Sequence, residues 1–378
     1  MLCSAELELF DLSSNATVQF LETIIRISNS YGIFHKYICL FLCVIGIFAN
    51  LVHILVLTRP VMNKSGVNRL LSIIALCDIF IMISYTFFII RFGFMVDLNN
   101  PPVGYELRWI VFLMIHVIVS IAFHTIALYL WVATAYIRYK SLKKLGSKWN
   151  RQDSACPIFI VILAIILVLC VPTFLVHDVV KVDIVGGEYL YNVGLSELST
   201  ENTCFIFKLN LWLTGIFFKV IPCILLFTFT LALLWELELN RRRRKHLISG
   251  YSLASKKISA QSDRTTIMLV ILLGVFLMTE LPQGILAILN GLFPNDIHQF
   301  IYISLGEILD LLSLFNCTAC FVVYPIMSSV YRQTLRKFLL SFCRVKKSTP
   351  ATAITRCKLS SFYEPPSIRF CTENDVLL

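Results

Sequence analysis

The sequence is short of charged residues. Asp, Glu, Lys and Arg make up 15% of its 378 residues, and 57% of the residues are hydrophobic, whereas soluble domains are roughly one quarter charged. A chain of this composition has too little polar surface for a soluble globular protein. The composition therefore predicts a membrane protein.

Several catalytic and processing signals are also missing. The chain has no H-E-x-x-H motif, no clustered metal ligands and no Ser-His pairing signal, so we expect no enzyme, no metal and no cofactor. Its 13 cysteines are scattered without histidine partners, which argues against a zinc site or a disulfide-rich module. The first ten residues lack the basic and apolar regions of a cleaved signal peptide, so the first membrane span is expected to direct insertion.

Long apolar runs are what the sequence does contain. A membrane helix needs about 20 residues to cross a hydrocarbon core of about 30 Å, and helices are the only open-ended elements that span a bilayer. The chain is therefore predicted to be an all-α membrane protein, a seven-transmembrane helix bundle with a short amphipathic helix after the last span. The predicted spans are 37–58, 68–93, 109–138, 155–177, 206–237, 266–292 and 299–325. The predicted regions are an extracellular N-terminus (1–36), the bundle (37–325), an amphipathic juxtamembrane helix (326–343) and a disordered cytosolic tail (344–378).

The basic residues predict the orientation. They gather in the connections after spans three and five, as in Arg241–Arg244, and in the tail. Positively charged loops stay in the cytosol, so we expect a plasma-membrane protein with an extracellular N-terminus. Asn15-Ala16-Thr17 is an N-glycosylation sequon on that outer side. The net charge of +10 is explained by anionic lipid near these loops rather than by nucleic acid.

Polar residues recur inside the spans in a joint pattern. Span one carries Asn50 after Gly46, and span two carries Asp78, for which Asn316 of span seven is a candidate partner. Such residues face the bundle interior and are functional candidates. Arg138 at the inner end of span three has a simpler reading as a snorkelling side chain. Proline in spans five and six (Pro222 and Pro282) and a tyrosine at the inner end of span seven (Tyr324) complete the pattern.

With these motifs, the chain resembles the rhodopsin-like (class A) G-protein-coupled receptors over Lys36 to Cys343. The strings FHTIALYLWVATAYIRY and DRTTIMLVILLGVFLMTELPQGILAILN more narrowly resemble invertebrate myosuppressin and FMRFamide-like neuropeptide receptors. The resemblance implies a receptor for an amidated peptide of the Arg-Phe-amide type. It also implies signalling to heterotrimeric G proteins by outward movement of span six.

The chain departs from the pattern of that family at several positions. Ile137 stands where an acidic residue usually precedes the arginine of span three, Glu280 replaces a tryptophan, and Cys320-Phe321 replaces Asn-Pro. An intact sodium site around Asp78 is therefore not assumed. The outer end of span three lacks a cysteine, so Cys204 has no usual disulfide mate, and Cys3 is only a candidate.

Glu280 is the most unusual residue, because a carboxylate inside a membrane span needs a partner. It shares a helical face with Phe276 and Gln283, beside the bend expected at Pro282. Lys219 lies at comparable depth in span five, so we expect a buried Lys219–Glu280 ion pair. Two roles remain open: the pair satisfies its own two members, or it is a switch that ligand charge displaces.

The outer half of the bundle is the expected ligand site. Glu307 and Asp310 are three residues apart and face one way, so they suit the arginine of a peptide. Buried histidines are more often hydrogen-bonded core residues than ligand contacts, and both roles remain open for His116 and His124. The remaining candidate ligand residues are His116, Phe123, His124 and Gln283.

The cytosolic side is expected to couple to partners. Arg138, Tyr139 and Arg264 are the candidate G-protein contacts, Cys343 is a candidate palmitoylation site or an ordinary thiol, and the tail offers serines and threonines to a receptor kinase and arrestin. The alternative functions are a chemosensory receptor for a small molecule and, less favoured, a transporter. Transporters usually show internal repeats, and none was found.

Overall fold

The computed structural model describes residues 9–97, 102–143, 152–183, 189–247 and 253–345. In this part of the chain, seven helical segments are long and apolar enough to cross a membrane, which confirms the predicted seven-transmembrane bundle. Residues up to Arg336 form one compact unit that holds all seven. Helix α10 (Ser329–Val345) follows the last span and begins within this unit.

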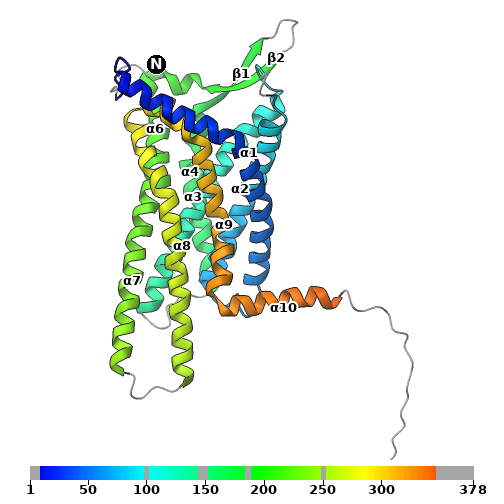
Figure 1. Cartoon of the computed structure of the whole chain (residues 1–378), viewed down its shortest axis with the longest axis vertical. Helices are drawn as coiled ribbons and strands as arrows, with labels where there is room; N and C mark the ends of the chain where they lie inside the picture. Colours follow the sequence, from blue (N-terminus) through cyan, green and yellow to red (C-terminus); the bar gives the residue numbers. More distant parts are fainter. Residues whose placement is uncertain (1–8, 98–101, 144–151, 184–188, 248–252, 346–378) are drawn as a thin grey trace, which may run out of the picture. The chain divides into compact units, whose positions relative to one another are not determined.

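Several spans are built from more than one helical element (Figure 1). The first three are α1 (Asn15–Leu57), α2 (Gly66–Phe88) with the π-helical η1 (Ile89–Phe94), and α3 (Leu107–Lys143). The fourth follows a short 3₁₀ turn, η3 (Gln152–Ser154), and consists of α4 (Ala155–Leu169) and α5 (Val171–Val176). The fifth runs through α6 (Glu197–Trp212), the π-helical η4 (Leu213–Val220) and α7 (Ile221–Leu247). The last two are α8 (Leu253–Leu292), and the π-helical η5 (Ile297–Tyr302) with α9 (Ile303–Met327).

A two-stranded hairpin joins the fourth and fifth spans. Strands β1 (His177–Asp183) and β2 (Tyr189–Leu195) are antiparallel, with His177 opposite Leu195. Tyr105, just before α3, forms a bridge with Tyr191 of β2. We call the end of the bundle that carries this hairpin the hairpin end, and the opposite end, where α3 carries Arg138, the Arg138 end (Figure 1).

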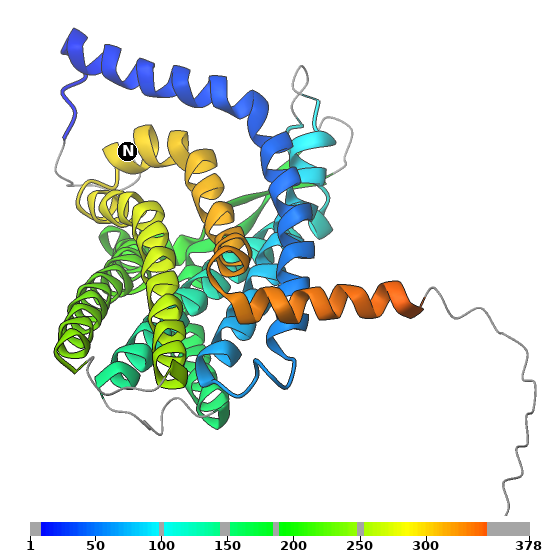
Figure 2. The same cartoon turned by 60° about the horizontal axis from the view of Figure 1, so that its bottom comes forward.

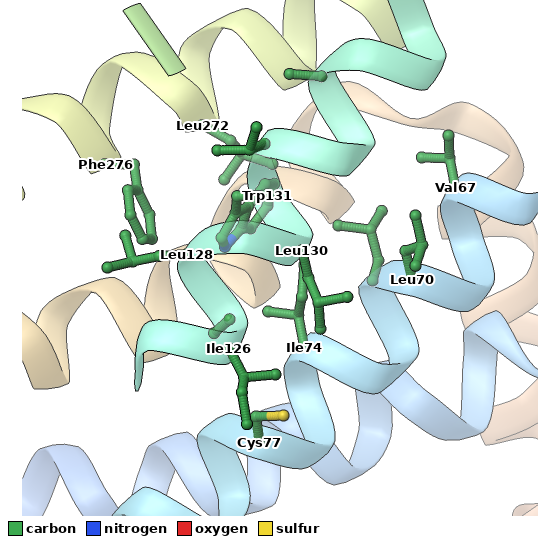
Figure 3. Close-up of a cluster of buried hydrophobic side chains, with 14 of the residues drawn as sticks. Val67, Leu70, Ile74, Cys77, Ile126, Leu128, Leu130, Trp131, Leu272 and Phe276 are labelled. Atoms are coloured by element: carbon green, nitrogen blue, oxygen red, sulfur yellow. The ribbon is translucent and has the colours of Figure 1, made fainter. Parts of the chain in front are cut away.

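The main apolar core lies between α2, α3 and α8 (Figure 3). Leu70 and Ile74 of α2 and Leu130 of α3 are at most 1% exposed, and Trp131 packs beside Phe276 of α8. Lipid tails are as apolar as these side chains, so close packing, rather than exclusion from water, stabilises such contacts. The core therefore fixes α8 against α3 just below Glu280.

Helix α1 begins at Asn15, although the first predicted span begins at residue 37. Its 43 residues measure about 65 Å at about 1.5 Å per residue, roughly twice the thickness of the hydrocarbon core. The helix bends near the hairpin end, and its N-terminal part runs along the rim of the bundle beside the start of α9 (Figures 1 and 2). We call residues 15–34 of α1 the strap.

The strap is attached to the start of the seventh span. The hydroxyl of Ser28 donates to the carbonyl of Ser304. Before the strap, the backbone amides of Leu9 and Phe10 donate to the Asp296 carboxylate at 2.5 and 3.0 Å. The Phe10 ring also contacts Phe300 edge-on.

Candidate functional site

The Glu280 carboxylate is the centre of a polar network inside the bundle. Glu280 is 0% exposed. Its Oε2 accepts a hydrogen bond from Lys219 Nζ at 2.8 Å, and its Oε1 accepts from Asn316 Nδ2 at 2.9 Å and lies 3.0 Å from His124 Nε2. Side chains from α3, η4 and α9 thus meet on one side chain of α8.

Lys219 has a second acceptor in the network. Its ammonium group donates to Gln283 Oε1 at 2.7 Å, and Gln283 Nε2 reaches Ser313 of α9 at 3.3 Å. Glu280 and Gln283 lie on the buried face of α8, whereas Met278 is 80% exposed. The Lys219–Glu280 contact expected from the sequence is therefore present, and Gln283 extends it to the seventh span.

The π-helical turn η4 brings Lys219 to this depth. A π-helical turn inserts extra residues into a helix, and such turns occur often at functional sites. Gly215 in η4 lies directly against α8, since a Cβ added there would be 3.2 Å from the carbonyl oxygen of Ala287. Only glycine permits this approach without displacement of the helices, and the approach lets Lys219 reach Glu280.

The Asp78 carboxylate has a different partner from the one expected. Asn316 donates to Glu280, whereas the hydrogen-bond partner of Asp78 on α9 is the thiol of the next residue, Cys317. Successive residues of a helix point about 100° apart. Asn316 therefore faces Glu280, while the next residue, Cys317, faces Asp78. Asn50 Nδ2 donates across to the carbonyl of Cys317 at 2.8 Å.

Nearer the hairpin end, a second hydrogen-bonded chain leads to the acidic pair. Tyr85 of α2 donates to Asp310 at 2.9 Å and lies 3.0 Å from His35 Nε2, while His35 Nδ1 lies 3.1 Å from the Tyr31 hydroxyl. Asp310 and Glu307 are exposed, although Asp310 is within the electrostatic range of Lys219. Tyr31, His35 and Tyr85 were not predicted as site residues: Tyr31 and His35 precede the first predicted span, and the only signal at Tyr85 was a polar group inside an apolar run.

Glu307 lies against the first helix. A Cβ added to Gly32 would be 2.8 Å from Glu307 Oε2, so the small residue makes room for this carboxylate. The acidic pair therefore stands between α1 and α2 on one side and the Lys219–Glu280 network on the other.

The three predicted ligand residues of α3 have separate surroundings. His116 is 6% exposed, stacks on Phe88 and Phe112, and lies 3.2 Å from the hydroxyl of Ser84. Phe123 stacks on Phe80, a side chain that is 48% exposed. His124 belongs to the Glu280 network described above. These residues thus do not form one pocket wall in this state.

At the Arg138 end, Tyr324 of α9 donates to Asn68 of α2 at 3.0 Å and lies within the electrostatic range of Arg138. Arg138 is half-buried, and in the part of the chain that the structure describes its buried Nε has no hydrogen-bond partner. Its neighbour Tyr139 is also half-buried. The residue before Arg138 is Ile137, so α3 offers it no acidic side chain at that position.

The other predicted positions are less informative. Asn15 is exposed at the first turn of α1, and Pro282 lies within α8. The side chains of Arg264 and Cys343 lie outside the described residues, as does the tail after residue 345. Cys204 is disulfide-bonded and has a positive φ of 60°, while Cys3, its candidate mate, also lies outside them.

Comparisons with known proteins agree with this architecture. The family model of the serpentine type 7TM GPCR chemoreceptor Srw matches residues 36–342. The chain is 29% identical to the G-protein coupled receptor dmsr-1 of Caenorhabditis elegans over 357 residues, which covers 84% of this chain and 70% of that protein. It is 25% identical to the Sex peptide receptor of Drosophila melanogaster over 328 residues, covering 82% of this chain and 73% of that receptor.

The chain belongs to the Srw family of seven-transmembrane G-protein-coupled receptors. It is a multi-pass membrane receptor and not an enzyme. The family implies a peptide or small-molecule ligand and coupling to a G protein.

Proposed function

We propose that this chain is a rhodopsin-like receptor of the plasma membrane for an amidated neuropeptide of the myosuppressin or FMRFamide-like, Arg-Phe-amide type. The observation that carries the proposal is the exposed acidic pair Glu307 and Asp310 at the hairpin end. One carboxylate is positioned by Tyr85 and the other rests against α1. A guanidinium group binds such carboxylates through charge-assisted, forked hydrogen bonds.

The amidated aromatic end of the peptide would lie beside the acidic pair, towards His116, which contacts the Tyr85 ring, and its stacked neighbour Phe112. Aromatic rings contact each other favourably in offset-stacked or edge-on geometry. The acidic pair leads to the central network, because Asp310 is within the electrostatic range of Lys219, which Gln283 shares with Glu280. The ligand thus acts on the same lysine that holds α8.

The Lys219–Glu280 pair is the switch in this proposal. The cationic peptide neutralises Asp310 and competes with Lys219 for hydrogen bonds to Gln283. The contacts of Lys219 therefore differ between the free and bound receptor. A ligand shifts a conformational equilibrium only through such differential contacts. Released from Lys219 and Asn316, α8 pivots at Pro282, and Phe276 moves relative to Trp131.

The G protein enters at the Arg138 end, where Arg138, Tyr139 and Arg264 offer positive charge. The hairpin end faces the outside, Asn15 carries a glycan, and Cys343 is palmitoylated. The tail binds arrestin after a receptor kinase phosphorylates it. Similarity to the Sex peptide receptor supports a peptide ligand. The chemoreceptor description of the family favours a small molecule as the second candidate.

The test is G-protein activation in cells that express this chain at verified surface levels. A panel of Arg-Phe-amide peptides is compared with the free acids and with peptides in which citrulline replaces arginine, because citrulline keeps the shape and removes the charge. We expect responses to the amides, and weaker responses to the other two forms.

Receptor variants test whether the arginine of the peptide binds the acidic pair. In Asp310→Asn the loss of potency on replacing arginine by citrulline should shrink, because the charge partner is already absent. Glu22→Gln is the matched control, since Glu22 is an exposed acid on the strap. Silence to every peptide would contradict the peptide proposal and favour the small-molecule candidate.

A further inference from the structure

A row of exposed apolar side chains runs along one side of α1. Phe20, Ile27, Phe34, Phe41 and Phe48 are 53%, 57%, 61%, 65% and 68% exposed. Residues seven apart are two turns apart and drift by about 20° per step around a helix, so the row turns by about 80° from Phe20 to Phe48. Phe41 and Phe48 lie in the membrane-spanning half, so this row is part of the lipid-facing surface and continues from it into the strap.

The other sides of the strap have different surroundings. Leu21 and Ser28 are 5% and 8% exposed and face the seventh span, where Ser28 bonds to Ser304. Glu22 and Arg26 are exposed and polar. The side of Glu22 and Arg26 also carries Ile33, which is 66% exposed. The strap therefore has one side on the bundle, one mixed side and one apolar side, as expected for a helix that lies in a membrane interface.

The strap lies at the edge of the bundle. It runs along the rim of the bundle beside α9, not across the centre of the hairpin end (Figures 1 and 2). A helix at the rim, level with the end of a membrane span, adjoins lipid headgroups. Its apolar row would otherwise meet water at three large side chains in succession.

We propose that the strap is an interfacial helix that inserts Phe20, Ile27 and Phe34 into the lipid leaflet at the hairpin end. The occupant of this face is phospholipid, because the row is continuous with the lipid-facing row of the same helix. Bonds to Ser304 hold one side of the strap and lipid holds another, so the strap is a fixed wall at the rim of the bundle. This inference is independent of the ligand.

Site-specific photo-crosslinking tests the proposal. The full chain is reconstituted in phosphatidylcholine vesicles with p-benzoylphenylalanine at position 20 or 27, one position at a time. The matched controls carry the same probe at Glu22 and Arg26 on the polar side, and yields are normalised to the probe at Phe41 within the span. After irradiation, peptide mass spectrometry identifies the product at each position.

We expect phosphatidylcholine adducts at positions 20 and 27 in several-fold higher yield than at 22 and 26. Cross-links between two receptor chains at positions 20 and 27 would overturn the proposal, because a second copy would then cover the row. Equal lipid yields at all four positions, or cross-links only within the chain, would overturn it as well.

Discussion

Substitution of Glu280 by glutamine tests the central network most directly. The change keeps the shape of the side chain and removes its charge, while Lys219 stays 20% exposed and bonded to Gln283. Loss of one member of a buried ion pair costs about 3–5 kcal/mol of stability. Because Lys219 keeps Gln283 as an acceptor, the cost of Glu280→Gln should be about 3 kcal/mol. If about 1.4 kcal/mol of that cost falls on the resting arrangement alone, the ratio of resting to active receptor falls about tenfold.

The assay is basal G-protein activation at matched surface expression, together with the thermal unfolding midpoint of the purified receptor. Glu280→Gln and Lys219→Met should each raise basal activity and lower the midpoint. The double variant should be less destabilised than the sum of the single variants, because neither charge is then buried without its partner.

One result would refute the switch. If both single variants lower the unfolding midpoint but leave basal and peptide-stimulated signalling unchanged, the pair only satisfies its own members. Additive effects in the double variant would show that the two charges are not coupled, despite their 2.8 Å contact.

Two further variants probe the surroundings of the network. Tyr85→Phe removes the donor to Asp310 and should lower the potency of arginine-containing peptides by about ten- to a hundredfold, since a hydrogen bond to a charged group contributes about 1.5–3 kcal/mol. Tyr37→Phe, at an exposed tyrosine of α1, should leave the dose–response curve unchanged, and an equal effect of both would count against the role of Tyr85. Gly215→Ala should lower the unfolding midpoint, because the added methyl group crowds α8 and costs roughly 1–3 kcal/mol of stability. Gly274→Ala, where an added Cβ has nothing within 4 Å, should raise the midpoint. The opposite order would contradict the described packing.

The span count and the Lys219–Glu280 contact could be predicted because both depend on depth. Apolar runs of sufficient length define the spans. A lysine and a glutamate at the same depth inside the membrane are expected to pair, because an unpaired charge there is costly. The same reasoning could not decide rotation. Asn316 and Cys317 are adjacent, and only the packed helix shows that Asn316 faces Glu280.

The strap was missed because its sequence mixes polar and apolar residues, so no apolar run marks it. Its signal was the seven-residue spacing of Phe20, Ile27 and Phe34, which continues the row of the first span. His124 was predicted to be either a ligand contact or a hydrogen-bonded core residue, and in the structure it lies 3.0 Å from Glu280. A histidine near a buried carboxylate is expected to form a hydrogen bond with it. A single sequence does not reveal which helices lie close enough for this contact.

The convergence of three helices on Glu280 bears on how the receptor responds to different ligands. Because Glu280 contacts His124 of α3, Lys219 of η4 and Asn316 of α9, a rotation of α8 changes all three contacts together. Packed, bonded elements of this kind have discrete arrangements rather than a continuous range. Partial agonists should therefore differ in the fraction of receptors they convert, while each converted molecule undergoes the same movement.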